Sequence, residues 1–135
     1  MAIVIGYLGA LAAFLVADMA WLGAMVGRLY RPVLGDIAAP SVNLSAAAAF
    51  YLIFPIGLAI FAIAPGLRGG SLTLAAVNGA LFGLFTYATY DLTNQATLRN
   101  WTTQLTLIDT AWGVTLGALS ASAGFVAASR YAAAG

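Results

Sequence analysis

Two aspartates lie within long apolar stretches of this chain, and each is followed three residues later by tryptophan. The pairs are Asp18 with Trp21 and Asp109 with Trp112. An ionised carboxylate in the hydrocarbon core of a membrane is costly, so such residues face a bundle interior, a polar partner or water. A carboxyl group in that setting can exchange a proton or hydrogen-bond a ligand. The two aspartates are therefore the leading candidates for a functional site.

The composition indicates an integral membrane protein. Hydrophobic residues make up 63% and charged residues 7% of the 135 positions, whereas about 25% of residues are charged in soluble domains. Histidine and cysteine are absent, which removes the usual general base, thiol nucleophiles and zinc-thiolate sites. The five basic residues form no basic patch, so no nucleic-acid partner is expected. No cofactor is expected either.

Four apolar stretches are long enough to cross a hydrocarbon core of about 30 Å, which takes roughly 20 helical residues. We expect an all-α, integral membrane four-helix bundle that forms a single domain over residues 1–135. The first stretch lacks a basic leading segment and is too long for the apolar part of a cleavable signal peptide. The helices are predicted at about 2–27, 44–64, 71–92 and 103–131.

Two further residues carry structural expectations. Pro55 falls within the second predicted helix, where it predicts a kink because proline lacks an amide hydrogen and clashes with the preceding turn. Trp101 closes the third connection, and tryptophan at such a position is typical of an anchor at the membrane interface.

Helix direction predicts that the two aspartates lie at similar depth. The first helix runs toward the first connection, and the fourth runs away from the third connection, which is on the same side of the membrane. At a rise of 1.5 Å per residue, Asp18 lies about 15 Å from Arg28 and Asp109 about 12 Å from Trp101 along their helices. Both carboxyl groups should therefore face one region of the bundle.

The third helix adds polar residues on that same side. Tyr87, Asp91 and Asn94 follow one another at helical spacing and form a stripe, with Asp91 expected at the end of the helix. This convergence predicts a one-sided pocket that binds a ligand. Its predicted lining is Asp18, Trp21, Tyr87, Tyr90, Asp91, Asn94, Asp109 and Trp112.

A binding pocket and a purely structural role both remain open for these residues. In the structural alternative, Trp and Tyr donors bond the aspartates and lock the helices together. In the functional one, aromatic walls with a few polar groups form a ligand site. Because that site would lie in the bilayer, we expect lipid binding, with a small amphiphile such as a lipid or isoprenoid-type molecule as ligand.

Other functions are compatible with the same residues. An intramembrane enzyme could use Asp18 or Asp109 as general acid or base on a lipid, although no nucleophile is evident. Whether the protein is an enzyme therefore stays open. A small proton-linked transporter and an accessory subunit of a larger membrane complex are further alternatives. Gly79 and Gly83 match the small-xxx-small pattern, which favours packing within the chain or a homodimer. The aspartates match no metal-binding spacing, so no metal is expected.

Several of these segments together resemble a family of small, four-helix bacterial inner-membrane proteins of unknown function. The resemblance spans nearly the whole chain and implies a multi-pass protein of the bacterial inner membrane. It supplies no reaction, ligand or catalytic residue. Pro55 departs from the family pattern, which bears only on the shape of the second helix. The segments that carry the resemblance most specifically are 18–23, 89–94 and 109–113.

Overall fold

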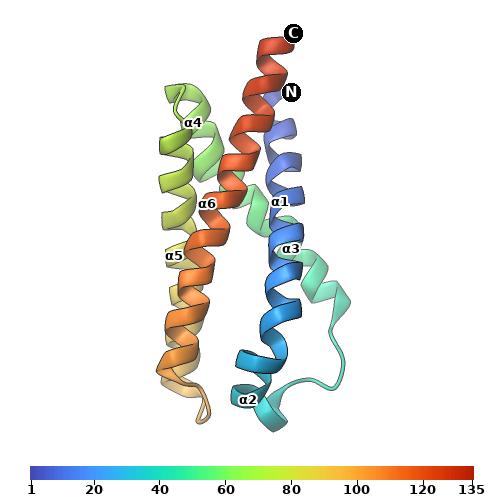
Figure 1. Ribbon diagram of the computed structural model, residues 1–135, viewed down its shortest axis with the longest axis vertical. Coiled ribbons are helices and arrows are strands. Elements are labelled where there is room, and N and C mark those ends of the chain that lie inside the picture. Colours follow the sequence, from blue (N-terminus) through green and yellow to red (C-terminus); the bar gives the residue numbers. More distant parts are fainter.

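The computed structural model describes all 135 residues and consists of helices without strands (Figure 1). Four helical segments are long and apolar enough to cross a membrane, which confirms the expected all-α membrane fold. Large apolar side chains are exposed around the bundle, as is typical of a surface that contacts a membrane. The four segments are Ala2–Ile37, Leu44–Gly69, Leu72–Thr97 and Thr103–Ala134.

Two of the four segments are composite, and the other two are the continuous helices α5 (Leu72–Thr97) and α6 (Thr103–Ala134). The first segment comprises α1 (Ala2–Met25), a π-helical turn (Val26–Tyr30), α2 (Arg31–Leu34) and a 3-10 turn (Gly35–Ile37). The second comprises α3 (Leu44–Leu58), a π-helical turn (Ala59–Ile63) and α4 (Ala64–Gly69).

The first segment continues well past the predicted end at residue 27. The amide of Arg31 donates to the carbonyl of Val26, so the chain turns once with a wider π-helical pitch before α2 begins. Pro32 follows directly and has no amide hydrogen of its own. The segment predicted as a loop is therefore largely helical, and this change places Tyr30 on the bundle.

The third segment is also longer than predicted, reaching Thr97 rather than residue 92. Within this polar end, the threonine hydroxyls are satisfied by carbonyls of the same helix. The Thr93 hydroxyl donates to the carbonyl of Thr89 at 2.6 Å, and that of Thr97 to the carbonyl of Thr93 at 2.9 Å. Asp91 consequently lies inside α5 and not at its end. The second and fourth segments extend to residues 69 and 134.

Pro55 and Trp101 both lie inside the bundle. Pro55 is buried in α3, and a π-helical turn follows it at residues 59–63. The kink expected at the proline itself stays a prediction. Trp101 is only 8% exposed, and its Nε1 donates to Thr106 Oγ1 at 3.0 Å. It packs with Leu29 and Leu105, and its position at the membrane interface stays a prediction.

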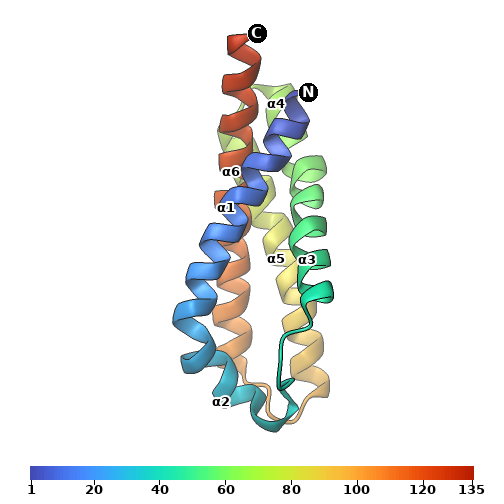
Figure 2. The same ribbon diagram turned by 90° about the vertical axis from the view of Figure 1, so that its right-hand side faces the viewer.

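Helix α6 lies between α1 and α5, and both chain termini lie at the opposite end from α2 (Figure 1). The second view shows α3 on the far side of the bundle from the lower part of α1 (Figure 2). Helices α1 and α3 diverge toward the end that holds α2 in both views. This divergence separates the walls of the site described below.

Glycines bring the backbones of α5 and α6 into contact. A Cβ atom at Gly79 would overlap the carbonyl oxygen of Gly117, and one at Gly83 would overlap that of Gly113. A Cβ at Gly113 would in turn overlap the ring of Tyr87. The small-xxx-small residues of these two helices therefore serve packing within the chain.

Replacing Gly83 by alanine should lower the free energy of unfolding by about 1 to 3 kcal/mol, because the added methyl group forces two packed backbones apart. Gly23→Ala is the matched control, since no atom lies within 4 Å of a Cβ at that helical position. Its stability should stay the same or rise slightly. Thermal unfolding of the two variants in detergent measures the difference, and equal stability would contradict this packing.

The helix order predicts which connections share a membrane side. Single cysteines at Ser41 and Thr97, both exposed at the end that holds α2, should react with an impermeant thiol reagent from one side. A cysteine at Gly69, at the other end, should react from the opposite side. The native chain has no cysteine, so the background is clean. Labelling of Ser41 and Thr97 from opposite sides would show that the number of spans is wrong.

Candidate functional site

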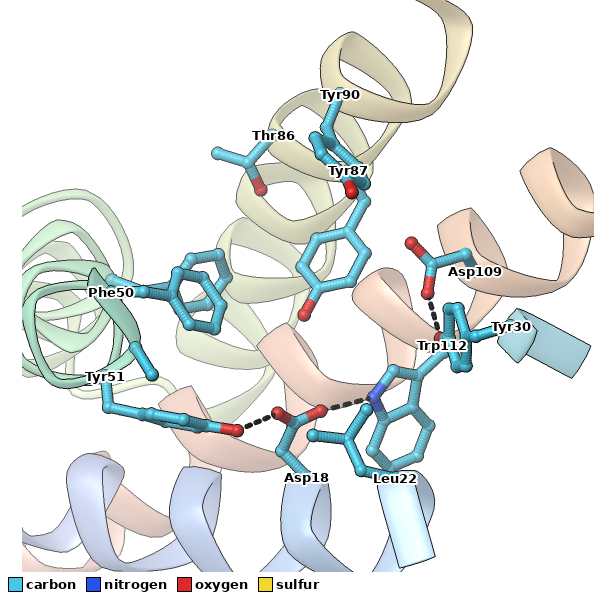
Figure 3. A pocket seen from close by; sticks show the side chains of 12 residues that line it. Asp18, Leu22, Tyr30, Phe50, Tyr51, Thr86, Tyr87, Tyr90, Asp109 and Trp112 are labelled. Atoms are coloured by element: carbon cyan, nitrogen blue, oxygen red, sulfur yellow. Dashed lines mark hydrogen bonds between the residues drawn. The ribbon is translucent and has the colours of Figure 1, made fainter. Parts of the chain in front are cut away.

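A cavity of about 570 Å³ lies among α1, α3, α5 and α6, in the half of the bundle where α1 and α3 diverge (Figure 3). Its volume is within the roughly 300–1,000 Å³ that is usual for small-molecule sites. Seven of its twelve lining residues are aromatic and two are aspartates. The lining residues are Asp18, Leu22, Tyr30, Ala47, Phe50, Tyr51, Phe54, Thr86, Tyr87, Tyr90, Asp109 and Trp112.

The structure brings five of the eight predicted site residues to this cavity. They are Asp18, Tyr87, Tyr90, Asp109 and Trp112. Trp21, Asp91 and Asn94 do not line it. Asn94 is half-buried near the end of α5. Trp21 contacts two lining residues, Tyr30 and Trp112. Asp91 contacts Thr110, which is next to the lining residue Asp109 in the chain.

Each tryptophan of the two Asp-Trp pairs is linked to the aspartate of the other pair. Trp112 Nε1 on α6 donates to Asp18 Oδ1 on α1 at 3.0 Å. Trp21 on α1 instead donates to the hydroxyl of Tyr30 at 2.8 Å, and that hydroxyl donates to Asp109 Oδ1 on α6. The two indole rings stack with centroids 4.5 Å apart and planes only 3° from parallel. The crossed bonds and the stack together tie α1 to α6.

Asp18 on α1 accepts hydrogen bonds from two other helices. Its Oδ2 accepts from the hydroxyl of Tyr51 on α3 at 2.6 Å, while its Oδ1 accepts from Trp112 (Figure 3). Asp18 is only 5% exposed. Because a buried donor or acceptor without a partner is costly, this carboxyl group defines where α1, α3 and α6 meet.

Asp91 is completely buried beside the cavity wall. Its Oδ2 accepts from the hydroxyl of Thr110 on α6 at 3.1 Å, whereas its Oδ1 has no hydrogen-bond partner in the chain. Asp91 therefore links α5 to α6 from behind the cavity. It adds a third carboxyl group to this half of the bundle without lining the site.

Seven of the lining residues were not identified from the sequence. Two of these seven are the tyrosines that donate hydrogen bonds to the aspartates. Tyr30 lies beyond residue 27, where the first helix was predicted to end, and the continuation of that helical segment brings it to Asp109. Tyr51 lies in α3, where the aromatic spacing of Phe50, Tyr51 and Phe54 in an alanine-rich helix is the one signal that could have indicated it. The other missed residues are Leu22, Ala47, Phe50, Phe54 and Thr86.

The carboxyl groups of the site have no basic side chain as a partner. No arginine lines the cavity, and all five arginines of the chain are exposed. The aspartates are stabilised by neutral donors from Tyr and Trp alone. The hydroxyl of Tyr87 points into the cavity and makes no hydrogen bond within the chain (Figure 3). The site thus offers two carboxyl groups and one free hydroxyl within aromatic walls.

Asp18→Leu should lower the free energy of unfolding by about 1 to 3 kcal/mol, since it leaves the Tyr51 hydroxyl and the Trp112 indole without their acceptor. Asp18→Asn keeps one acceptor oxygen and should lose less. Met19→Leu, at a neighbouring lipid-facing position, is the control and should be unchanged. Thermal unfolding in detergent compares the three variants. Equal stability of the Leu and Asn variants would show that the hydrogen bonds contribute nothing.

Comparison with known proteins agrees with the resemblance seen in the sequence. A family model described as "Predicted membrane protein (DUF2177)" matches residues 3–126. No curated protein and no solved structure matched the chain. The matched region includes residues from all four helical segments that could cross a membrane. The chain therefore belongs to the DUF2177 family of predicted membrane proteins, whose function is unknown.

Proposed function

We propose that this membrane protein binds a small, lipid-like amphiphile in the cavity between α1, α3, α5 and α6. The observation that carries the proposal is the cavity itself, which combines aromatic walls with two carboxyl groups inside an apolar bundle. Such a combination suits a molecule with an apolar chain and one polar group. The family resemblance supports a further proposal, that the membrane is the bacterial inner membrane.

The cavity can divide its contacts between the two parts of an amphiphile. Phe50 and Phe54 line its side toward α3, and they offer apolar surface to a hydrocarbon chain. The carboxyl groups of Asp18 and Asp109 lie on the side toward α1 and α6 (Figure 3). A bound amphiphile would place its polar group there, beside the free hydroxyl of Tyr87.

The cavity is not fully enclosed by its walls. Phe50 on α3 and Tyr90 on α5 line it and are 40% and 57% exposed. Because α3 and α5 belong to segments that are long and apolar enough to cross a membrane, we propose that a molecule dissolved in the bilayer enters between them. Entry from the bilayer would favour a lipid-like ligand over a water-soluble one.

Binding is favoured over catalysis by the state of the polar groups. Thr86 is the only aliphatic hydroxyl in the lining, and it donates to the carbonyls of Phe82 and Gly83 in its own helix. No base lies next to it to activate it as a nucleophile. Both oxygens of Asp18 already accept hydrogen bonds. The hydrogen bonds of Thr86 and Asp18 are therefore already used within the protein, which favours a binding role over catalysis.

Native mass spectrometry of the gently solubilised protein tests the proposal. The wild type should retain a lipid-sized adduct, and adding that lipid should raise the melting temperature, because binding to the folded state stabilises it. Ala47→Phe should abolish both effects, since the added ring fills the cavity. Ala48→Phe is the matched control, because the neighbouring Ala48 is exposed outside the cavity.

The outcomes separate the alternatives. If no lipid class is retained or raises the melting temperature, the site residues serve only to hold the helices together. Stoichiometric copurification of other proteins would instead favour an accessory subunit. If both alanine variants retain the adduct equally, the lipid binds the outer surface and the cavity proposal is wrong.

A further inference from the structure

We infer that the polar group of the ligand is a cation, an amine or quaternary ammonium carried on an apolar chain. The inference rests on the proposed function and names the ligand class for the same cavity. It follows from the charge of the lining, the chemistry of the walls and the position of the arginines.

The lining carries carboxyl groups without any basic side chain to balance them. Asp18 and Asp109 are 5% and 6% exposed and both line the cavity. A third carboxyl group, that of Asp91, is buried directly behind the wall on α5. An anionic headgroup would find no basic side chain here to replace its hydration. A cation would instead pair with the carboxyl groups.

The aromatic residues reinforce this preference. Tyr30, Tyr51, Tyr87 and Trp112 come from four different helical segments and surround the two carboxyl groups (Figure 3). The faces of aromatic rings attract cations, and aromatic cages recognise quaternary ammonium groups in particular. An uncharged alcohol could hydrogen-bond the carboxylates but would gain nothing from the rings. The cage thus favours a cation over a neutral polar group.

The position of the arginines makes the cavity unlike a phosphate site. Phosphate recognition in proteins relies on Arg or Lys, or on free backbone amides at a helix start. The arginines of this chain are all exposed and none lines the cavity. Ala47, the fourth residue of α3, is the lining residue nearest to a helix start, and its amide already donates to the carbonyl of Asn43.

Three probes with one chain length test the charge preference. Octyltrimethylammonium, octyl phosphate and octanol are titrated into the protein in a neutral maltoside detergent, and binding is followed by the intrinsic tryptophan fluorescence, to which Trp112 at the cavity wall contributes. Only the signal that Ala47→Phe removes and Ala48→Phe keeps counts as cavity binding. The cation should bind at least about tenfold more tightly than the other two probes.

Two substitutions locate the preference at the carboxyl groups. Asp109→Asn should weaken binding of the ammonium probe by roughly tenfold and leave octanol unchanged. Asp36→Asn removes the same charge at an exposed position outside the cavity and should change neither. Asp18→Asn provides the same test at the second carboxyl group should Asp109→Asn fail to fold.

One further probe distinguishes a lipid headgroup from a free lipophilic cation as the source of the ammonium group. Dihexanoylphosphatidylcholine carries the same quaternary ammonium next to a phosphate. Binding comparable to that of octyltrimethylammonium supports the inference with a lipid headgroup as source, and much weaker binding supports it with a free lipophilic cation as source.

Two results would overturn the inference in distinguishable ways. If octyl phosphate or octanol shows cavity binding as tight as the ammonium probe, the charge preference is wrong while the proposed function stands. If no probe gives a signal that depends on Ala47→Phe, both the inference and the proposed cavity binding are wrong.

Discussion

Two carboxyl groups inside an apolar bundle, with no basic side chain beside them, are the constraint on which the rest of this structure depends. A carboxyl group buried away from water is stabilised by hydrogen-bond donors within the protein. In this chain the donors are the indoles and phenols of α1, α3 and α6 and the turn that follows α1. Where these donors meet the aspartates, the helices have fixed positions relative to one another.

The backbones of α5 and α6 pack closely, whereas the site lies where α1 and α3 are farther apart. Glycines at Gly79, Gly83, Gly113 and Gly117 let α5 and α6 touch along their length, and they leave no space between these two helices. Helices α1 and α3 have no comparable seam near α2 and diverge there. The cavity lies where aromatic side chains span this wider separation.

The same hydrogen bonds are therefore compatible with both a structural and a binding role. Interhelical bonds within membranes contribute modestly to stability, averaging about 0.6 kcal/mol, so the network around Asp18 and Asp109 does not by itself account for burying two acidic groups. The cavity next to the carboxyl groups leaves space for a ligand that could contact them. A cationic ligand would also relieve the charge that the tyrosines and tryptophans only partly stabilise.

The sequence by itself determined the membrane class, the four spans and the position of Asp18 and Asp109 in the bundle interior. These properties follow from the length and composition of apolar stretches and from the cost of a carboxylate within them, which are local quantities. It also placed Tyr87, Tyr90 and Trp112 correctly near the aspartates, because direction and helical rise fix depth once the spans are known.

Only the tertiary structure decided which donors the aspartates use. Tyr51 and Tyr30 bond them from positions 33 and 79 residues away, and no pattern of spacing reveals a contact over such separations. Tyr30 depends in addition on a widened turn before Pro32, which local propensity does not predict. Asp91 was placed at a helix end because the polar residues after it are typical of a loop, whereas α5 continues to Thr97. These contacts and helix ends depend on how the four segments pack against one another, which composition and spacing along the chain do not determine.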